Sequence, residues 1–500
     1  MRSVLIANRG EIALRIIRAC HEEGLEAVAV YSAADRASPF VRAADRAAPI
    51  GPAPAGESYL SIERLLAAAR ETGADAVHPG YGFLAERAAF AEAVERAGLV
   101  WIGPPPAAIA AMGDKPEARR RMAAAGVPVV PGTEPVTDPE AARARARELG
   151  FPVMVKAAAG GGGKGMRAVR SEAELPGALA AASSEAAKAF GDPAVYLEKL
   201  IEAPRHVEIQ VLADQRRTIH LGERECSIQR RHQKLVEEAP SVAVTPDLRE
   251  AMGRAAVAAA RAVGYRSAGT CEFLLARDGS FYFLEMNTRI QVEHPVTELV
   301  YGVDLVREQL RIARGLPMGV AEGPLAPRGW AIECRITSED PAHGFLPSTG
   351  RIAFLRVPGG PGVRWDGGIE IGDEVTRYYD SLLGKLVVWG ADRAQAIARI
   401  ERALAELAIV GVATNQGFHR RLLADPAFRR GEVDIQFLER RPDLLVPAAD
   451  PALELDLAVA AALAEEEARG ARRPAGSNGR GPDAGGASPW VRQARIDALR

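Results

Sequence analysis

Polar side chains of alternating type follow a short hydrophobic run in the second half of the chain. Residues 285–293 read Glu-Met-Asn-Thr-Arg-Ile-Gln-Val-Glu, so an acid, an amide, a cation, an amide and an acid occupy every second position. On an extended strand such positions share one face. The pattern predicts a face that offers oxygen ligands to a hard cation beside a cation that can hold an anion. Its members are Glu285, Asn287, Arg289, Gln291 and Glu293.

A further carboxylate faces this row across a predicted β-hairpin. Asp278-Gly279, the strongest short-range signal for a two-residue hairpin turn, separates two β-type runs. A two-residue turn there pairs Glu272 with Glu285, whose Cβ atoms then lie only ~5 Å apart. Two ionised carboxylates at that separation repel each other unless a proton or a cation lies between them. We therefore predict that Glu272, Glu285 and Asn287 bind Mg²⁺ or Mn²⁺; the alternative is an exposed acidic strand face.

A run of glycines follows a second predicted strand. This apolar strand ends in Lys156, and residues 160–165 read Gly-Gly-Gly-Gly-Lys-Gly. Backbone N–H groups in such a segment can close around phosphate oxygens while a lysine supplies positive charge. The segment is not a Walker A loop, because Ala158 and Gly165 stand where that motif needs a glycine and a hydroxyl residue. It predicts a mobile flap over a nucleotide, paired with a strand at 166–169; a flexible linker is the alternative.

The composition excludes several classes of protein. The 500 residues exceed one hydrophobic core, so about two to four domains are expected. A balance of 63 basic and 65 acidic residues gives a net charge of -2, which removes the electrostatic argument for a nucleic-acid or anionic-membrane partner. Four cysteines without Cys-x-x-Cys spacing support neither a disulfide framework nor a zinc site. The first apolar run is too short for a signal peptide or a membrane span, so a cytoplasmic enzyme is expected.

Short β-type runs alternate with helical patterns in the first 112 residues. The β-type runs are 4–7, 27–31, 76–78 and 100–102. This alternation predicts a parallel sheet with helices on its faces, and the lack of a Gly-x-Gly-x-x-Gly motif disfavours a dinucleotide site. Along the whole chain we predict an N-terminal domain at 1–112, a central domain at 113–317 with a flap subdomain at about 130–204, a β-rich domain at 330–438, and a low-complexity tail at 445–500.

Several motifs occur in an order that resembles one family. Residues 7–13 read Ala-Asn-Arg-Gly-Glu-Ile-Ala, residues 78–83 read His-Pro-Gly-Tyr-Gly-Phe, and residues 345–348 read Phe-Leu-Pro-Ser. With the glycine-rich segment, the predicted metal ligands and the run Arg-Ile-Gln-Val-Glu-His-Pro at 289–295, they resemble the ATP-grasp biotin carboxylases. The resemblance covers about 3–438. It implies an α/β fold, α+β overall, with an ATP-grasp central domain between a Rossmann-like N-terminal domain and a β-rich C-terminal domain.

The resemblance also implies roles for individual residues. ATP would contact Lys115, Lys156, Gly162, Gly163, Glu198, Lys199, Leu200, Ile201, His206, Gln229, His232, Glu272 and Glu285. Bicarbonate would bind at Lys234, Arg289, Gln291 and Val292. Glu293 would be the base that deprotonates bicarbonate, and Arg335 would steady the enolate of the biotin ureido group, with Gly82 in the biotin pocket. The catalytic set is Lys234, Arg289, Glu293 and Arg335.

The implied reaction needs partners. ATP is a substrate, and Mg²⁺ or Mn²⁺ is the implied metal. No methionine is followed by lysine, so the Ala-Met-Lys-Met type of acceptor sequence is absent and biotin is expected on a separate biotin carboxyl carrier protein. A separate carboxyltransferase would select the final acceptor, acetyl-CoA or another acyl-CoA, as in fatty acid synthesis. A homodimer is also implied, with Arg18, Glu22 and Arg364 near the contact.

Three other functions share part of this pattern. An ATP-binding subunit of a pyruvate carboxylase would carry the same motifs. Another ATP-grasp ligase, such as one that makes carbamoyl phosphate or a purine intermediate, would share Lys156, the flap and the metal ligands, but not 289–295 together with Arg335. A non-catalytic nucleotide-binding regulator would have lost a metal ligand or the base, and all of these residues are present.

Overall fold

The computed structural model describes residues 1–136, 138–157, 166–190, 193–321, 325–446, 459–463 and 465. The chain divides into two compact units, Met1–Pro447 and Ala448–Arg500, and the fold given below is that of the first unit. The predicted glycine flap, with Gly162 and Gly163, and most of the predicted tail lie outside the described residues. None of the helices in the described part of the chain combines the length and the apolar composition needed to cross a bilayer.

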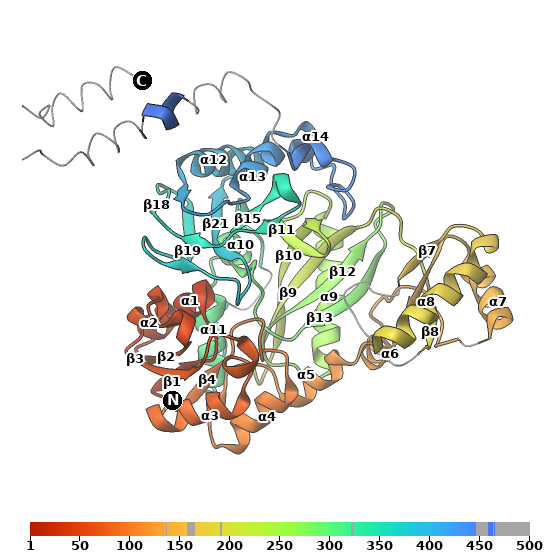
Figure 1. The fold of residues 1–500 in the computed structure, drawn as a ribbon. Coiled ribbons are helices and arrows are strands. Elements are labelled where there is room, and N and C mark those ends of the chain that lie inside the picture. Colours follow the sequence, from red (N-terminus) through yellow and green to blue (C-terminus); the bar gives the residue numbers. More distant parts are fainter. Residues whose placement is uncertain are drawn as a thin grey trace, which may run out of the picture. The chain divides into compact units, whose positions relative to one another are not determined.

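The N-terminal region is a parallel sheet with helices packed on it, as the alternating pattern predicts (Figure 1). Its five strands lie in the order β3-β2-β1-β4-β5, and the central strand β1 is fully buried. The edge strand β3 is not predicted, because Arg46 and Pro49 interrupt its apolar residues. The elements are β1 (Ser3–Ile6), α1 (Gly10–Glu22), β2 (Glu26–Ser32), α2 (Pro39–Ala43), β3 (Arg46–Gly51), α3 (Ile62–Thr72), β4 (Ala76–His78), α4 (Ala88–Arg96), β5 (Val100–Trp101) and α5 (Pro106–Gly113).

A small antiparallel sheet follows in the chain. Its order is β7-β6-β8, with helices α7 and α8 packed on it (Figure 1). Val153 of β6 pairs with Val169 of β7, so the predicted pairing of the strands on either side of the glycine-rich segment is confirmed. The elements are α6 (Lys115–Ala124), α7 (Pro139–Leu149), β6 (Val153–Ala157), β7 (Arg167–Val169), α8 (Leu175–Phe190) and β8 (Val195–Lys199).

One continuous antiparallel sheet joins the regions predicted as the second and third domains. Its eight strands lie in the order β13-β12-β9-β10-β11-β14-β21-β19. Strand β11 pairs with β14 through Val236 and Cys334, so side chains from both regions meet on one sheet. The strands are β9 (Arg205–Ala213), β10 (Thr218–Arg230), β11 (Gln233–Ala239), β12 (Ser267–Leu275), β13 (Phe281–Asn287), β14 (Trp330–Thr337), β19 (Val363–Gly367) and β21 (Leu382–Gly390).

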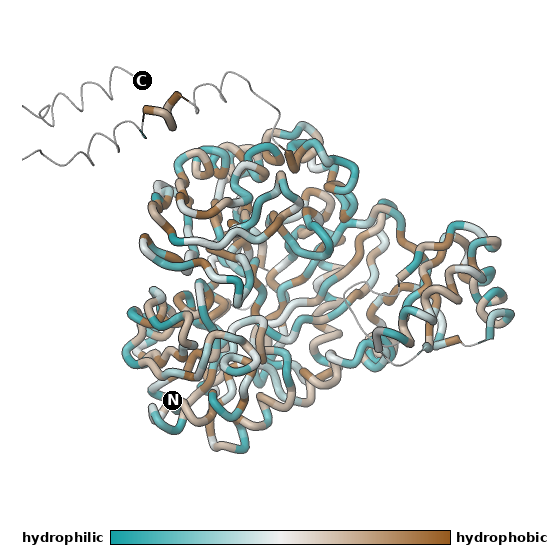
Figure 2. The backbone as a smooth tube through the Cα atoms, viewed as in Figure 1, coloured by the Kyte–Doolittle hydropathy of each residue, from teal (hydrophilic) through white to brown (hydrophobic). Residues whose placement is uncertain are grey.

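The two faces of this sheet differ in polarity. On β9, Val207 and Ile209 are buried against helix α9 (Pro246–Ala262), while Glu208 and Gln210 point to the other face, because strand side chains alternate. Helices α10 (His294–Tyr301) and α11 (Leu305–Ala313) pack on that second face. Figure 2 shows hydrophobic stretches within the layers and hydrophilic stretches at outer loops. The polar side chains at alternate positions of the strands, such as Glu208 and Gln210, are therefore buried between the sheet and helices α10 and α11.

Short strands and helices complete the C-terminal region. Helices α12 and α13 cover the face of β14 and β21 that lies opposite α10. The elements are β15 (Glu339–Asp340), β16 (Leu346–Pro347), β17 (Gly350–Arg351), β18 (Phe354–Arg356), β20 (Glu374–Val375), α12 (Arg393–Glu406), β22 (Ala408–Val410), α13 (Gln416–Ala424) and α14 (Pro426–Arg430).

The β12–β13 hairpin pairs Glu272 with Glu285 as predicted, although its turn differs from the predicted one. The N–H of Ala276 bonds to the carbonyl of Ser280 at 2.8 Å, which leaves three residues in the turn and not two. The longer turn shifts the strand register by one residue, and a bulge between Glu272 and Phe273 shifts it back by one residue. The predicted turn is therefore wrong, and the pairing of the two glutamates is confirmed.

The extended chain predicted after the hairpin ends sooner than expected. Strand β13 stops at Asn287, and Glu293 stands at the N-cap of α10, whose first turn contains Pro295. Proline fits the first turn of a helix, which explains the change from strand to helix. Arg289 and Gln291 therefore lie in a loop, and the prediction that one strand face carries the whole row is wrong.

Candidate active site

Lys234 lies at the centre of a group of buried carboxylates. Its Nζ lies 2.6 Å from Glu208, 2.8 Å from Glu272 and 2.7 Å from Glu293. An ammonium group has three donors, so all of them are used. Burial lowers the pKa of Lys234, but the three carboxylates outweigh burial and raise it well above its usual range. Lys234 is therefore a fixed positive charge.

Neighbouring strands of the central sheet supply this group. Glu208 lies opposite Glu272 on β12 and opposite Arg224 on β10, so the three side chains share one face. Arg224 is fully buried and donates to Glu208 at 2.5 Å and to Thr297 at 2.9 Å. Arg224 thus neutralises most of the charge of Glu208. The positive charge of Lys234 is therefore balanced mainly by Glu272 and Glu293.

Glu293 is held between two cations. Its Oε1 accepts a hydrogen bond from Lys234, and its Oε2 lies 3.0 Å from the Arg335 guanidinium. Arg335 also donates from Nε to Glu237 at 2.6 Å. Burial opposes ionisation of Glu293, but Lys234, Arg335 and Arg224 together hold its pKa well below the usual range. Glu293 is therefore ionised at neutral pH.

The predicted metal ligands lie together at the β12–β13 hairpin. Glu272 lies opposite Glu285, and Asn287 Nδ2 lies 2.9 Å from Glu272 Oε1. Burial and then the charge of Glu272 raise the pKa of Glu285, while Lys115 opposes this from 3.6 Å. A divalent cation relieves this kind of repulsion between carboxylates, so the residues fit Mg²⁺ or Mn²⁺.

Glu272 is the member of this pair that is already ionised. Its Oε2 lies 3.1 Å from His206 Nε2, and its Oε1 accepts from Lys234. Burial opposes ionisation, but Lys234 and His206 lower the pKa of Glu272 well below its usual range. Within the described residues, His206, Glu208 and Glu272 also place ligand atoms within 4.8 Å of one another. His206 therefore lies at the predicted metal site as well as in the predicted ATP site.

Two lysines that are predicted to contact ATP come from different elements. Lys115 is the first residue of α6, which Asp114 caps, and its ammonium group lies beside Glu285. Lys156 on β6 forms an ion pair with Glu198 on β8. Glu198 also accepts from Arg119 at 2.7 Å, a contact that sequence reasoning missed. The structure thus places Lys115 at the metal ligands and Lys156 on the small sheet.

The segment from Glu198 to Ile201, which is predicted to contact ATP, borders a cavity. The N–H groups of Lys199 and Leu200 already bond to backbone carbonyls, and Lys199 Nζ donates to the Gly150 carbonyl at 2.8 Å. Lys199 is thus used to join parts of the small sheet. Beyond it, a cavity of about 370 Å³ is lined by Arg170, Leu200, Ile201, Glu202, Ala203, Arg277 and Gln436.

Gln229 and His232 lie at the β10–β11 hairpin. Gln229 is buried and pairs with Lys234 across the two strands. Arg231 and His232 form the turn with φ of 49° and 66°, backbone values that a two-residue type I′ turn requires. His232 is exposed at this turn, so the structure does not bring it into the group around Lys234.

A carboxylate that sequence reasoning missed orients Arg289. Glu86 accepts from Arg289 Nε at 2.9 Å and from the Thr288 N–H at 3.1 Å. Arg289 also lies 3.2 Å from Asn287 Oδ1 and 3.0 Å from Gln291 Oε1. The loop after β13 therefore brings Arg289 and Gln291 back to the metal ligands, although neither lies on the strand.

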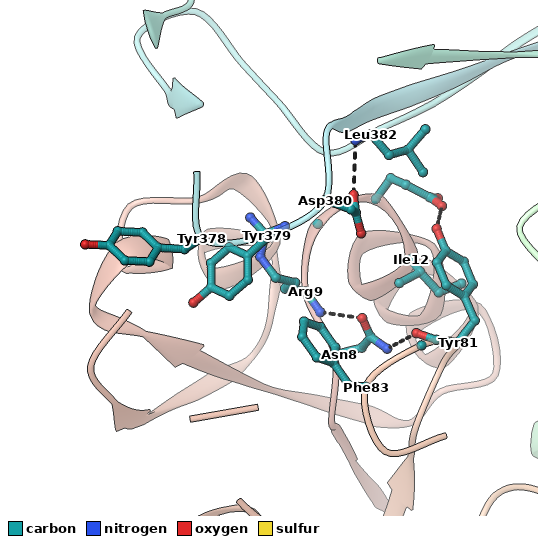
Figure 3. A pocket seen from close by; sticks show the side chains of 12 residues that line it. Asn8, Arg9, Ile12, Tyr81, Phe83, Tyr378, Tyr379, Asp380 and Leu382 are labelled. Carbon is teal, nitrogen blue, oxygen red and sulfur yellow. Dashed lines mark hydrogen bonds between the residues drawn. The ribbon is translucent and has the colours of Figure 1, made fainter. Parts of the chain in front are cut away.

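Gly82 is one of the residues that line a cavity of about 300 Å³. Figure 3 shows labelled side chains around this cavity, among them Tyr81 and Tyr379. Asn8 holds the loop of Gly82 by donating to the carbonyls of Pro79 and Tyr81, and the Tyr81 hydroxyl bonds to Glu11. Gly82 itself has φ of 69°, a conformation that favours glycine. The opposite wall consists of Tyr378, Tyr379 and Asp380. Arg335 is not among the described residues that line this cavity, so the two predicted biotin contacts are not brought together in it.

Sequence reasoning missed other charged residues of the site. Glu208 and Arg224 stand at alternate positions of strands that face Glu272, so applying the period-two rule to β9 and β10 would have found them. Glu86 lies 203 residues before Arg289, and no local pattern links the two.

Family models match most of the chain. The models of the biotin carboxylase N-terminal domain, the carbamoyl-phosphate synthase L chain ATP-binding domain and the biotin carboxylase C-terminal domain match residues 1–109, 114–320 and 333–440. The biotin carboxylase of Nostoc sp. is 55% identical over 438 residues, which are 87% of this chain and 98% of that protein. A pyruvate carboxylase subunit from Methanothermobacter thermautotrophicus is 54% identical over 438 residues, which are 87% of this chain and 89% of that protein.

Solved structures show the same architecture. The β-γ-ATP complex of biotin carboxylase from Campylobacter jejuni superposes with a TM-score of 0.83 at 46% identity, covering 88% of this chain and 98% of that one. The biotin carboxylase domain dimer of Hydrogenobacter thermophilus 2-oxoglutarate carboxylase, in complex with MgADP, ADP and bicarbonate, gives a TM-score of 0.83 at 48% identity, covering 90% and 99%. The fold and the site thus define an ATP-dependent ligase of the ATP-grasp class. Within that class, the chain belongs to the biotin carboxylase family.

Proposed function

We propose that this chain carboxylates the biotin of a separate carrier protein, through carboxyphosphate, as the first half-reaction of an acetyl-CoA or other acyl-CoA carboxylase. The observation that carries the proposal is the position of Glu293, an ionised base held by Lys234 and Arg335 beside the metal ligands. Such a base suits an anion that must lose a proton before it attacks a phosphate. Bicarbonate is an anion of this kind.

The cations around Glu293 explain how its basicity would change during the reaction. Lys234 and Arg335 lower the pKa of Glu293 as long as they contact it. Bicarbonate bound beside Arg289 and Gln291 would attract Lys234, which raises the pKa of Glu293 and lets it accept the bicarbonate proton. Lys234 and Arg289 would then hold the negative charge of the deprotonated nucleophile.

Phosphoryl transfer would take place next to the hairpin. The adenine of ATP would lie at the cavity beyond Leu200 and Ile201, with the phosphates directed toward Lys115 and Lys156. Glu272, Glu285 and Asn287 would hold Mg²⁺ or Mn²⁺, which neutralises phosphate charge during transfer. The products are ADP and carboxyphosphate, and the predicted glycine flap would protect the latter from water.

Biotin would then receive the carboxyl group. Carboxyphosphate releases phosphate and carbon dioxide, the phosphate takes the ureido proton, and the biotin nitrogen bonds to the carbon dioxide. Arg335 would steady the enolate that forms on biotin, and Gly82 would contact biotin at the cavity of Figure 3. A homodimer is part of the proposal, since the related Hydrogenobacter domain is a dimer.

A second candidate concerns the final acceptor. The relative from Methanothermobacter is part of a pyruvate carboxylase, and the Hydrogenobacter domain belongs to a 2-oxoglutarate carboxylase. A 2-oxo acid in place of an acyl-CoA is therefore the alternative. Co-purification of the native complex decides between them, because the carboxyltransferase chain that accompanies this one determines the acceptor.

The activity is tested with the purified chain, Mg²⁺ and free biotin. ATP cleavage should be slow with bicarbonate alone and faster after biotin is added. Glu293→Gln should abolish both activities while ATP still binds, and Arg335→Ala should suppress biotin carboxylation more than bicarbonate-dependent cleavage. Arg402→Ala, at an exposed position on α12, is the matched control. Cleavage that needs no bicarbonate, or that ammonia stimulates and biotin does not, would instead indicate another ATP-grasp ligase.

A further inference from the structure

Glu237 and Glu333 are two buried carboxyl groups behind Arg335. They stand opposite each other on β11 and β14, so their Cβ atoms lie about 5 Å apart on the same face. Both residues are fully buried. Among the described residues, Oε1 of Glu237 has a hydrogen-bond partner, whereas Oε2 of Glu237 and both oxygens of Glu333 have none. Buried carboxyl oxygens without partners are costly, so the pair needs an explanation.

The nearby cations are committed elsewhere. Arg335 donates to Glu237 at 2.6 Å but shares its guanidinium with Glu293 at 3.0 Å. Lys385, on the next strand β21, donates to the Val292 carbonyl at 2.8 Å and lies 3.2 Å from Glu11. No cation of the described residues contacts Glu333 within 4.0 Å. Two ionised carboxylates at this place would therefore leave a buried negative charge unpaired.

We propose that Glu237 and Glu333 bind one proton between them, with Glu333 as the neutral partner that donates a hydrogen bond, directly or through one water molecule, to Glu237. This bond satisfies Oε2 of Glu237 and keeps a single negative charge behind Arg335. Glu333 is then a positioning residue: it fixes Glu237, and Glu237 fixes the guanidinium through Nε. The Nη2 edge of Arg335 stays directed toward Glu293 and the reaction. The inference rests on the proposed role of Arg335 toward biotin.

The directions of the pKa shifts agree with this arrangement. Burial raises the pKa of Glu333 well above its usual range, with Lys385 opposing and Glu237 adding to the shift. Burial also raises the pKa of Glu237 to about 7, against the effect of Arg335. A carboxyl group with a raised pKa keeps its proton below that pKa and loses it as the pH rises through it. The pair therefore becomes doubly negative on the alkaline side, where it holds Arg335 more tightly.

Other titratable groups surround the pair from every packed element. Lys234 lies on β11, Arg335 on β14 and Cys226 on β10. The rest are Lys385 on β21, Asp366 on β19, Glu11 on α1, and Glu293, His294 and Glu298 at α10. Of these, Glu293 and Lys234 act on biotin-independent ATP cleavage as well. A change that appears only when biotin is the acceptor therefore reports on the pair and Arg335.

Two substitutions at position 333 separate the hydrogen bond from the charge. Glu333→Gln keeps an N–H donor and removes the titration, so biotin carboxylation at neutral pH should stay within about twofold of wild type. Its decline in kcat/KM for biotin at alkaline pH should be smaller than that of the wild type. Glu333→Ala lacks the donor, so KM for biotin should rise about tenfold while bicarbonate-dependent ATP cleavage changes little. Glu308→Gln, a buried carboxyl on α11 that bonds to the Gly319 N–H, should alter none of these values.

Infrared spectroscopy tests the shared proton without any substrate. The spectrum of the wild type minus that of Glu333→Gln should show a protonated carboxyl band at neutral pH that disappears at high pH. An ionised carboxylate band at neutral pH, or an equal alkaline decline in the two proteins, would overturn the proposal. Because the infrared result is independent of catalysis, it stands even if Glu333→Ala does not fold. A normal biotin response of Arg335→Ala would count against the proposed function, and the band would still decide whether the proton is shared.

Discussion

At the scale of residues, the two hairpin glutamates differ although the strand register makes them equivalent. Glu272 has two cationic partners, Lys234 and His206, and its pKa is lowered. Glu285 is half-exposed, and within the described residues its one cationic partner is Lys115 at 3.6 Å. Burial and Glu272 raise the pKa of Glu285. The same charge-removing substitution should therefore act differently at the two positions, because one removes a buried ion-pair partner and the other removes a repulsion.

Glu272→Gln and Glu285→Gln should both sharply weaken Mg²⁺-dependent ATP turnover, since each removes a metal ligand. In the absence of metal, Glu272→Gln should lower the unfolding free energy by ~3 kcal/mol, because it removes a buried carboxylate that pairs with Lys234 and His206. Glu285→Gln should leave the melting temperature unchanged or slightly higher. Calorimetry without metal and ATP turnover with Mg²⁺ measure the two effects. A variant that loses stability at position 285 and keeps turnover would mean that the pair is structural.

At the scale of elements, buried ion pairs join strand β19 to helix α10. Arg364 donates to Glu298 at 2.7 Å and to Asp366 at 2.6 Å. Arg15 of α1 lies 2.9 Å from Glu298 as well. Arg364 thus forms its ion pairs inside the chain, and its place near a homodimer contact stays a prediction. These pairs hold together elements that come from distant parts of the sequence.

Asp366→Asn tests this connection through pH. Burial raises the pKa of Asp366, but Arg364 outweighs burial and lowers it from 3.8 to about 2. A carboxyl group with a lowered pKa stabilises the fold above its unfolded pKa and loses that contribution as the pH falls toward its folded value. The shift corresponds to about 2 kcal/mol. At pH 6 the free energy of unfolding of the wild type should therefore exceed that of Asp366→Asn by at least this amount.

The difference in unfolding free energy between the wild type and Asp366→Asn should become smaller as the pH falls from about 4 toward 2. Over that range Asp366 of the wild type becomes protonated, and it is then as neutral as the asparagine. Urea unfolding at a series of pH values measures it. Asp443→Asn, at an exposed ion pair, is the matched control and should give a difference near zero. A pH-independent difference for Asp366→Asn would show that the residue acts through packing and not through its charge.

At the scale of the whole molecule, the match to known families ends before the tail. The C-terminal family model ends at residue 440, and the relatives match 87–88% of the chain. Deletion of residues 470–500 should therefore leave ATP cleavage with free biotin within about twofold of the full chain. Binding to a carrier or carboxyltransferase chain is to be measured in parallel, because residues 470–500 lie beyond the family models. Loss of free-biotin activity on truncation would show that the tail belongs to the catalytic unit.

Local patterns in the sequence were enough to predict the N-terminal sheet, two strand pairings and the family. The parallel N-terminal sheet follows from the alternation of β-type and helical runs, since each element must bury one apolar face. The pairing of Glu272 with Glu285 and the strands on either side of the glycine-rich segment follow from strand period and turn residues. The order of the motifs identified the family, because each motif places its chemistry through residues that are close in sequence.

Only the tertiary structure shows which distant residues come into contact and which of the ionisable side chains are charged. Glu86 orients Arg289 across 203 residues, because folding brings the N-terminal region against the loop after β13. Arg335 contacts Glu293 across 42 residues, because β14 pairs with β11 in the large antiparallel sheet. The alternation of side chains along a strand predicts on which face of the sheet a residue lies. It does not predict which strand lies next to it. The low pKa of Glu293 and the raised pKa of Glu237 depend on burial and on cations from other strands. A sequence lists the ionisable groups, whereas their protonation depends on distances that exist only after folding.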